Sequence, residues 1–237
     1  MPILTQFLSN DWRNIMRDSS LRFFMAMPLL LFAVAVWGMP GFVRSVPALE
    51  PYKLEFVMFL GVQAGIMVGF IFSIILLDEK ESKVHLAFKV LPNSNLQFII
   101  ARLLPAGLFA WLIGLLSLRF NGVVPMDWLM ALKASPLFLF PGPILVLLVC
   151  SFAPNKVNGM AYFKGIDLFV TAPVLYFVFE GAWKELFRII PFWWTFGLVN
   201  DAVTGADSYI WTLLIGMAYN ILTLVLLIGL FGKRYWR

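Results

Sequence analysis

The sequence contains few of the residues that build catalytic or metal sites. Cysteine and histidine occur once each, as Cys150 and His85, and only 13% of the 237 residues are charged. A single cysteine excludes a disulfide within the chain, and a lone histidine lacks the partners that a zinc site needs. An intramembrane hydrolase would need a nucleophile and a base within the membrane, but His85 is predicted outside it and no aspartate pair is predicted at depth. We therefore expect no enzyme activity, no metal site and no cofactor bound by this chain.

The sequence also lacks a phosphate-binding loop. A loop of the form GxxxxGK[ST] needs a glycine five residues before the Gly-Lys pair, but Leu227 stands at that distance from Gly232-Lys233, and Arg234 follows. Nucleotide, if it is used, must bind another chain. The net charge is +5, yet the basic residues are scattered near the ends of apolar runs. Without a basic stripe and interleaved aromatic residues, we expect no nucleic-acid partner.

Apolar residues dominate instead. They make up 61% of the chain and the mean hydropathy is +0.87, whereas soluble domains are about 45–50% apolar. This composition predicts an all-α membrane protein, with residues 1–237 forming a single transmembrane domain. We expect six transmembrane helices, at about residues 21–39, 54–77, 96–118, 132–152, 161–179 and 209–231.

The distribution of lysine and arginine predicts the orientation in the membrane. These residues are more frequent in the N-terminal arm, residues 78–102, residues 153–165 and the C-terminal tail than in the opposite loops. The positive-inside rule then places both termini in the cytoplasm of a multi-pass protein of the plasma (inner) membrane. Residues 3–18 alternate at helical spacing and predict an amphipathic helix along the interface.

Polar residues within the predicted spans are few. Arg102 and Asp167 are expected near span ends, where their side chains can reach water. No proton-relay or ion-binding group is predicted at mid-membrane. A mainly apolar lining suits a hydrophobic, amphipathic or lipid-linked substrate.

Two further stretches have a regular pattern. Gly61, Gly65 and Gly69 recur every four residues, which predicts a close helix contact, within the bundle or in a dimer, although glycine is also common in membrane helices. Near the C-terminus, Pro191 interrupts an apolar run before Trp193 and Trp194. We expect two short helices that enter the outer leaflet, with aromatic residues that also suit a belt at the interface.

The most charged segment lies between the second and third spans and reads DEKESKVHLAFKVLP. We predict a short cytoplasmic helix over residues 78–91, with acidic residues at its beginning and one apolar face, although an ordinary charged loop is also compatible with the pattern. An exposed apolar face of this kind fits a groove in a partner. The residues expected to contact that partner are Asp78, Glu79, Glu81, Val84, His85, Phe88 and Leu91.

The run LLDEKESKVHLAFKVLPNSNLQFIIAR resembles the coupling region of permeases of the type-two ABC exporter family, and FAPNKVNGMAYFKGIDLFVTAP is similar to a loop of drug and fluoroquinolone export permeases. The chain departs from that pattern at Ser82-Lys83, where a Gly-Thr pair is frequent, and at Val90-Leu91 before Pro92, where a Ser or Thr is common.

The resemblance implies a half-transporter that pairs with a second permease, as a homodimer or heterodimer, and with two copies of an ABC ATPase subunit that hold ATP and Mg. Residues 78–91 would then be the coupling helix, and Pro191, Trp193 and Trp194 would belong to a re-entrant extracellular gate. Two alternatives stay open: an ATP-independent channel or secondary carrier, and a membrane scaffold or assembly factor.

Overall fold

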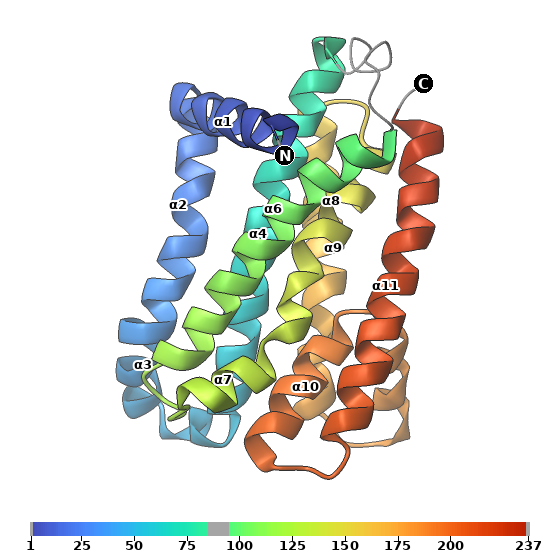
Figure 1. Ribbon diagram of the computed structural model, residues 1–237. Coiled ribbons are helices and arrows are strands. Elements are labelled where there is room, and N and C mark those ends of the chain that lie inside the picture. The colour runs from blue at the N-terminus through green and yellow to red at the C-terminus, as the bar shows by residue number, and fades with distance from the viewer. Residues whose placement is uncertain (1, 85–94, 236–237) are drawn as a thin grey trace.

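The computed structural model describes residues 2–84 and 95–235, and throughout these ranges the regular structure is helical, without a β-strand. The long helices run side by side in one bundle, and the first helix lies across the end that also holds the C-terminus (Figure 1). Within the described residues, five helices are long and apolar enough to cross a membrane, or six if one bent pair counts as a single span. The predicted all-α membrane fold is confirmed at this level.

The elements differ in length and type. In chain order they are α1 (Pro2–Arg17), α2 (Ser19–Ala33), a π-helical turn (Val34–Gly38), α3 (Met39–Ser45), a 3-10 helix (Pro47–Tyr52), α4 (Lys53–Glu81), α6 (Asn95–Phe120), α7 (Trp128–Ala134), η3 (Pro136–Leu139), α8 (Pro141–Phe152), α9 (Lys156–Thr171), η4 (Ala172–Phe177), η5 (Ala182–Ile189), α10 (Trp193–Thr204) and α11 (Tyr209–Arg234).

The first span is longer than predicted. Asp18 caps α2 by accepting hydrogen bonds from the backbone N–H groups of Ser20 (2.8 Å) and Leu21 (3.3 Å). The helix then continues through the π-helical turn into α3, so that Ser19–Ser45 forms one span. Pro40 lies just after the π-helical turn, where the regular hydrogen bonding of the α-helix is already interrupted. The predicted end of this span at residue 39 was therefore wrong.

Helix α4 lies at the centre of the bundle, in contact with α2, α6, α8, α9 and α10. Its glycines allow close packing. A Cβ atom on Gly65 would lie 3.2 Å from the Cβ of Ala110 on α6, and one on Gly69 would lie 2.5 Å from the carbonyl oxygen of Gly142 on α8. A Cβ on Gly61 would likewise lie 3.0 Å from the ring of Phe138. In this chain the glycine stripe thus faces neighbours within the bundle.

The fourth span is bent. The axes of Trp128–Ala134 and Pro136–Phe152 differ by 54°, at a break occupied by Pro136, a residue that cannot continue the backbone hydrogen bonding of a helix. Asp127 caps the first half by accepting from the backbone N–H of Met130 at 2.7 Å. Pro136, Pro141 and Pro143 all lie within the predicted fourth span.

Helix α9 begins earlier than predicted. Asn155 accepts a hydrogen bond from the backbone N–H of Asn158 at 2.8 Å and so caps a helix that begins at Lys156. Only residues 153–155 lie between α8 and α9. The predicted beginning of the fifth span at residue 161 was too late, because the polar residues before it belong to the first turns of the helix.

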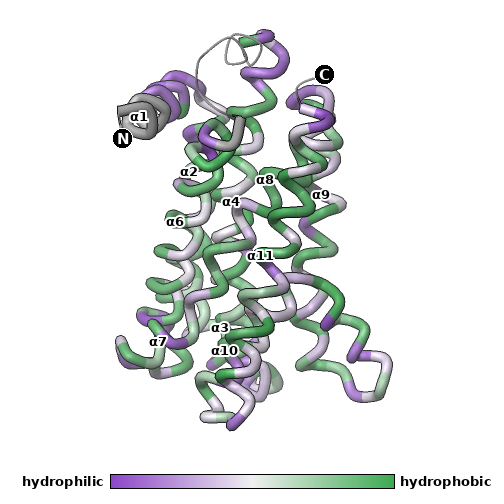
Figure 2. The backbone as a smooth tube through the Cα atoms, turned by 45° about the vertical axis from the view of Figure 1, so that its right-hand side comes forward, coloured by the Kyte–Doolittle hydropathy of each residue, from purple (hydrophilic) through white to green (hydrophobic). Residues whose placement is uncertain are grey.

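Two short helices precede the last span. η5 and α10 are separated by a turn that contains Pro191. Trp193 is buried and packs edge-to-face on Trp194, with 5.0 Å between the ring centroids. The left-handed backbone of Gly205 (φ 67°) then ends α10. Figure 2 shows that hydrophobic residues predominate along the middle of the bundle, with many of the hydrophilic ones towards its two ends.

Candidate functional site

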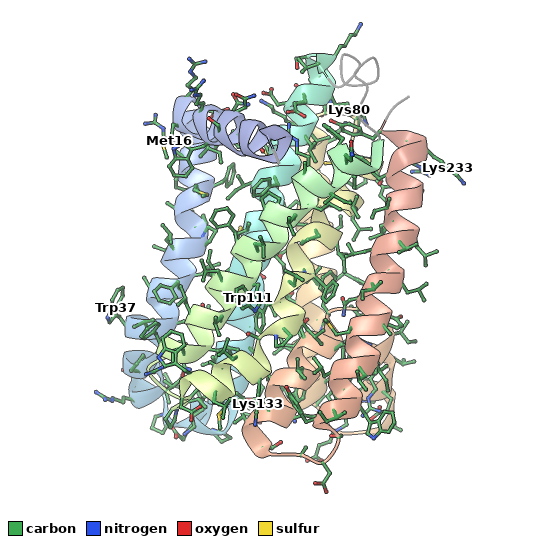
Figure 3. All side chains as sticks on the ribbon, in the orientation of Figure 1. Met16, Trp37, Lys80, Trp111, Lys133 and Lys233 are labelled. Carbon is green, nitrogen blue, oxygen red and sulfur yellow. The ribbon has the colours of Figure 1, made fainter. Side chains whose placement is uncertain are left out.

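Most of the charged contacts between helices gather at one end of the bundle. This end, here called the ionic end, brings together α1, the last turns of α4, the first turns of α6 and α9, and the residue after α11 (Figure 1). Lys80 and Lys233 lie towards this end and Lys133 lies at the opposite one (Figure 3). The ionic end is defined by Asp11, Asp78, Glu79, Lys80, Glu81, Arg102, Lys156 and Tyr235.

Arg102 joins three helices. From α6 its guanidinium forms ion pairs with Asp11 on α1 and with Glu79 on α4. The side chains of Arg102 and Asp11 are only 3% and 4% exposed. The expectation that Arg102 reaches water was therefore wrong, since its charge is balanced by buried carboxylates instead. Removing one member of such a group leaves an uncompensated buried charge, which is far more costly than the net benefit of the pair suggests.

The end of α4 is also fixed to the loop before α9. The Lys80 ammonium donates to the carbonyl oxygen of Ala153 at 3.2 Å, and the Asp78 carboxylate pairs with the Lys156 ammonium. Glu81 accepts from the backbone N–H of Lys156, one of the N–H groups left unpaired at the beginning of α9. A carboxylate in this position is favoured by the helix dipole. A displacement of the end of α4 would therefore act on α9 as well.

Tyr235 connects the chain's last helix to α4. Its hydroxyl donates to the carbonyl oxygen of Leu76 at 3.0 Å, and its ring stacks on Phe231 with 4.5 Å between centroids. Burial raises the pKa of the Tyr235 hydroxyl well above its usual range, so this group stays protonated and remains a donor. The Lys80 ammonium lies 5.8 Å from the centre of the same ring, within the range of a cation–π contact.

The structure corrects the predicted beginning of the 78–91 helix. Asp78, Glu79 and Glu81 lie in the last turns of α4, not at the start of a new helix. The helix ends at Ser82, and Lys83 adopts a left-handed conformation with φ 58°. Hydropathy had placed the end of the span at residue 77, although the helix itself continues into the charged residues.

The other residues expected to contact the partner come after the end of α4 in the sequence. Val84 is 45% exposed. His85, Phe88 and Leu91 lie outside the described residues, so their contact with a partner stays a prediction.

The face that α1 turns to the bundle differs from its most apolar side. Asp11 and Ile15, one turn apart, are buried, while Trp12 and Met16 are 53% and 44% exposed. Hydrophobic periodicity could not identify this face, because one of its residues is a carboxylate whose partner is 91 positions away in the sequence. The exposed Trp12 and Met16 suit a helix that lies at a membrane interface.

A second polar contact lies inside the bundle. The side-chain amide of Gln63 on α4 donates to Asp167 on α9 at 2.8 Å. Asp167 lies near the middle of the Lys156–Phe177 span. The prediction that it lies near a span end was wrong, because that span begins five residues earlier than expected. Two isolated polar residues in separate apolar runs were the only sequence signal for this contact.

The other predicted site residues lie apart from the ionic end. The glycine stripe occupies the middle of α4. Trp193 and Trp194 are the first residues of α10, and Pro191 lies in the turn before it. In residues 2–84 and 95–235, no group of three His, Cys, Asp or Glu side chains could hold a metal ion. The described residues thus form connected charges at one end of a largely apolar bundle.

A bundle of five or six apolar helices, with its buried charges at one end, defines a polytopic membrane protein. The chain belongs to the family described as Fluoroquinolones export permease protein Rv2686c-like, whose model matches residues 11–228. It is thus a member of an export permease family, as the sequence resemblance suggested. No curated protein and no solved structure matches the chain.

Proposed function

We propose that this chain is the membrane-spanning subunit of an ATP-driven exporter of the type-two ABC class. The observation that supports this most strongly is the family match over residues 11–228. The subunit would be a half-transporter that pairs with a second permease and works with two copies of a separate ATPase. ATP and Mg would bind those ATPase subunits, since this sequence contains no phosphate-binding loop.

The ionic end gives the proposal a mechanical basis. α4 is the central helix of the bundle, and the chain passes from it directly into the segment that resembles a coupling helix. Arg102 and Lys156 connect the last turns of α4 to α1, α6 and α9. A force applied to residues 82–91 by an ATPase would thus act on several helices together and not on one loop. The bundle would be oriented with this end, and both termini, in the cytoplasm.

The cargo would be a hydrophobic, amphipathic or lipid-linked molecule. The family name refers to fluoroquinolones, and most polar contacts inside the described bundle are local or lie at its ends. Pro191, Trp193 and Trp194 would form part of the exit on the opposite side. Their position at the beginning of α10, which packs against the last span, is compatible with this role.

A secondary carrier is the other candidate, and one observation favours it. Asp167 is an ionisable residue near the middle of a span, and residues of this kind take part in proton and ion coupling in carriers. The two candidates differ in their source of energy. An ABC exporter needs ATP hydrolysis, whereas a carrier needs an ion gradient.

Inside-out membrane vesicles distinguish the two. We would co-express the chain with an ABC ATPase that co-purifies with it and measure uptake of a fluorescent fluoroquinolone. The proposal predicts uptake that requires ATP, is abolished by vanadate and persists with a protonophore. A matched vesicle with the ATPase's phosphate-binding lysine replaced by alanine should show none. Uptake that is independent of ATP and abolished by the protonophore would contradict the proposal and establish a carrier.

A further inference from the structure

An apolar cavity lies between the beginning of α4 and the end of the fifth span. Its volume is about 390 Å³, within the usual range of about 300–1,000 Å³ for small-molecule sites. Tyr52, Phe56 and Phe59 line one side, and Val174 and Val178 line the other. Among the residues that line the cavity, Glu55 is the one with a charged side chain. The cavity therefore combines an apolar surface with a single carboxylate.

No neighbouring cation balances Glu55 within the described residues. Its Oε2 atom is enclosed and has no hydrogen-bond partner there. The nearby ammonium of Lys53 is bound to Glu50 at 2.7 Å instead. A carboxylate in apolar surroundings is costly unless it is paired or hydrogen-bonded. A bound molecule that brings a positive charge would supply the missing partner.

The contact between α4 and α9 continues this arrangement towards the middle of the bundle. Gln63 follows Glu55 by eight residues, or about 12 Å along a helix, and is 8% exposed. Its amide donates to Asp167, while its own Oε1 atom is buried without a partner in the described part of the chain. Asp167 likewise has no ion pair with any described residue. Both positions thus present oxygen acceptors and no positive charge.

We propose that this seam between α4 and the fifth span is a binding subsite for an amphipathic organic cation. The apolar body of the ligand occupies the cavity and its cationic group pairs with Glu55. The Gln63–Asp167 pair is the next acceptor for that group as the ligand moves inward. The transport step rests on the proposed function, but binding at the cavity does not require ATP or the ATPase.

Equilibrium binding to the purified full-length permease tests the subsite. The probe is a dansyl fluorophore linked to a trimethylammonium group, and its control is the same fluorophore linked to the neutral tert-butyl isostere. Loss of one charge pair worth about 1.4 kcal/mol weakens binding about tenfold. We therefore expect Glu55→Gln to weaken binding of the cation about tenfold and to leave the neutral probe unchanged. Glu185→Gln is the matched control, because Glu185 is exposed, is already paired with Arg188 and is not part of the cavity wall.

Equal affinity of wild type and Glu55→Gln for the cation would overturn the subsite, and so would an equal loss for both probes.

In vesicles that contain the ATPase, Asp167→Asn should lower export of the cation about tenfold relative to the neutral probe, the same factor as a lost charge pair. An unchanged export ratio would overturn the inward step. If cation-selective binding depends on Glu55 but no export depends on ATP, the subsite stands and the proposed function fails. If ATP drives export and Glu55→Gln has no effect on binding, the proposed function stands and the subsite fails.

Discussion

Helices α4 and α11 are equally apolar but occupy opposite environments. Their most apolar windows have the same mean hydropathy, yet 94% of the window in α4 is buried inside the chain and only 11% of that in α11. The glycines of α4 all meet neighbouring helices, whereas in α11 Gly216 meets Leu137 but the glycines nearer its end meet nothing among the described residues. A Cβ on Gly69 of α4 would meet the backbone of Gly142, whereas one on Gly229 of α11 would meet nothing within 4 Å. Hydropathy thus identifies a span, while close backbone contacts and polar connections determine which span becomes the centre.

Helices α4 and α11 also differ in how they are connected at the ionic end. α4 is connected there through Glu79 to Arg102 and through Asp78 to Lys156, whereas α11 is connected to α4 through the hydroxyl of Tyr235. The outer face of α11 carries exposed apolar residues, among them Leu222, Val225 and Leu226. Such a face suits lipid or the proposed second permease. The central helix is therefore the one whose perturbation should affect the whole bundle.

The largest effect is expected at Arg102. Arg102→Met leaves the carboxylates of Asp11 and Glu79 buried without their cation, which should lower the free energy of unfolding by about 3–5 kcal/mol. Denaturant titration in mixed micelles measures this change. The triple variant with Asp11→Asn and Glu79→Gln should recover much of the loss. Arg188→Met, which breaks an exposed pair with Glu185, should cost less than about 1 kcal/mol. Equal losses of stability in Arg102→Met and Arg188→Met would contradict the view that the buried ion pairs of the ionic end contribute more than an exposed pair.

The glycines test the comparison of α4 with α11 directly. Gly69→Ala places a methyl group against the backbone of α8, and overpacking of this kind costs about 1–3 kcal/mol. Gly229→Ala meets open space and should be neutral or stabilise α11 by up to about 1 kcal/mol, because alanine is the better helix former. The same titration compares them. A loss of stability from Gly229→Ala as large as that from Gly69→Ala would show that α11 is also packed, for example against a second subunit.

Tyr235 provides a smaller test of the link between the two helices. Tyr235→Phe removes the hydrogen bond to Leu76 but keeps the stacked ring, and should cost about 1 kcal/mol. Tyr219→Phe removes an exposed hydrogen bond from α11 to Ile189 and should cost less. Unfolding free energies in the same micelles distinguish the two. A larger loss at Tyr219 would place the main anchor of α11 at the opposite end of the bundle.

The smallest effect is expected at the end of α4. A left-handed conformation costs a residue with a Cβ atom about 1–2 kcal/mol, part of which glycine loses again through backbone entropy. Lys83→Gly should therefore stabilise the fold by about 0.5–1 kcal/mol, whereas Lys83→Ala retains the strain and should not. The difference between the unfolding free energies of these two variants measures the cost of the left-handed backbone conformation at residue 83. Stabilisation by both would instead assign the effect to loss of the lysine charge.

Much of the fold could be predicted from the sequence, because long apolar runs determine where spans lie and Pro136 determines where one bends. Helix ends were harder. The run from Lys156 to Gly165 contains enough polar residues to resemble a loop, yet Asn155 caps a helix there. The contacts of the ionic end were not predictable, since Arg102 and Asp11 are distant in sequence and no local pattern pairs them. Asp167 was misplaced for the related reason that its span was given the wrong beginning.

The central claim is that an ATPase acts on the segment that follows α4. The most direct measurement is ATP hydrolysis by the complex of the permease with the ATPase that co-purifies with it, with Phe88→Ala compared against Val157→Ala. Val157 is a control because it is 77% exposed and lies in the first turn of α9. We predict that Phe88→Ala weakens association with the ATPase and lowers hydrolysis by about tenfold, the effect of losing one anchor side chain, while Val157→Ala retains both. Failure of any ATPase to associate, or equal hydrolysis with both variants, would contradict the claim.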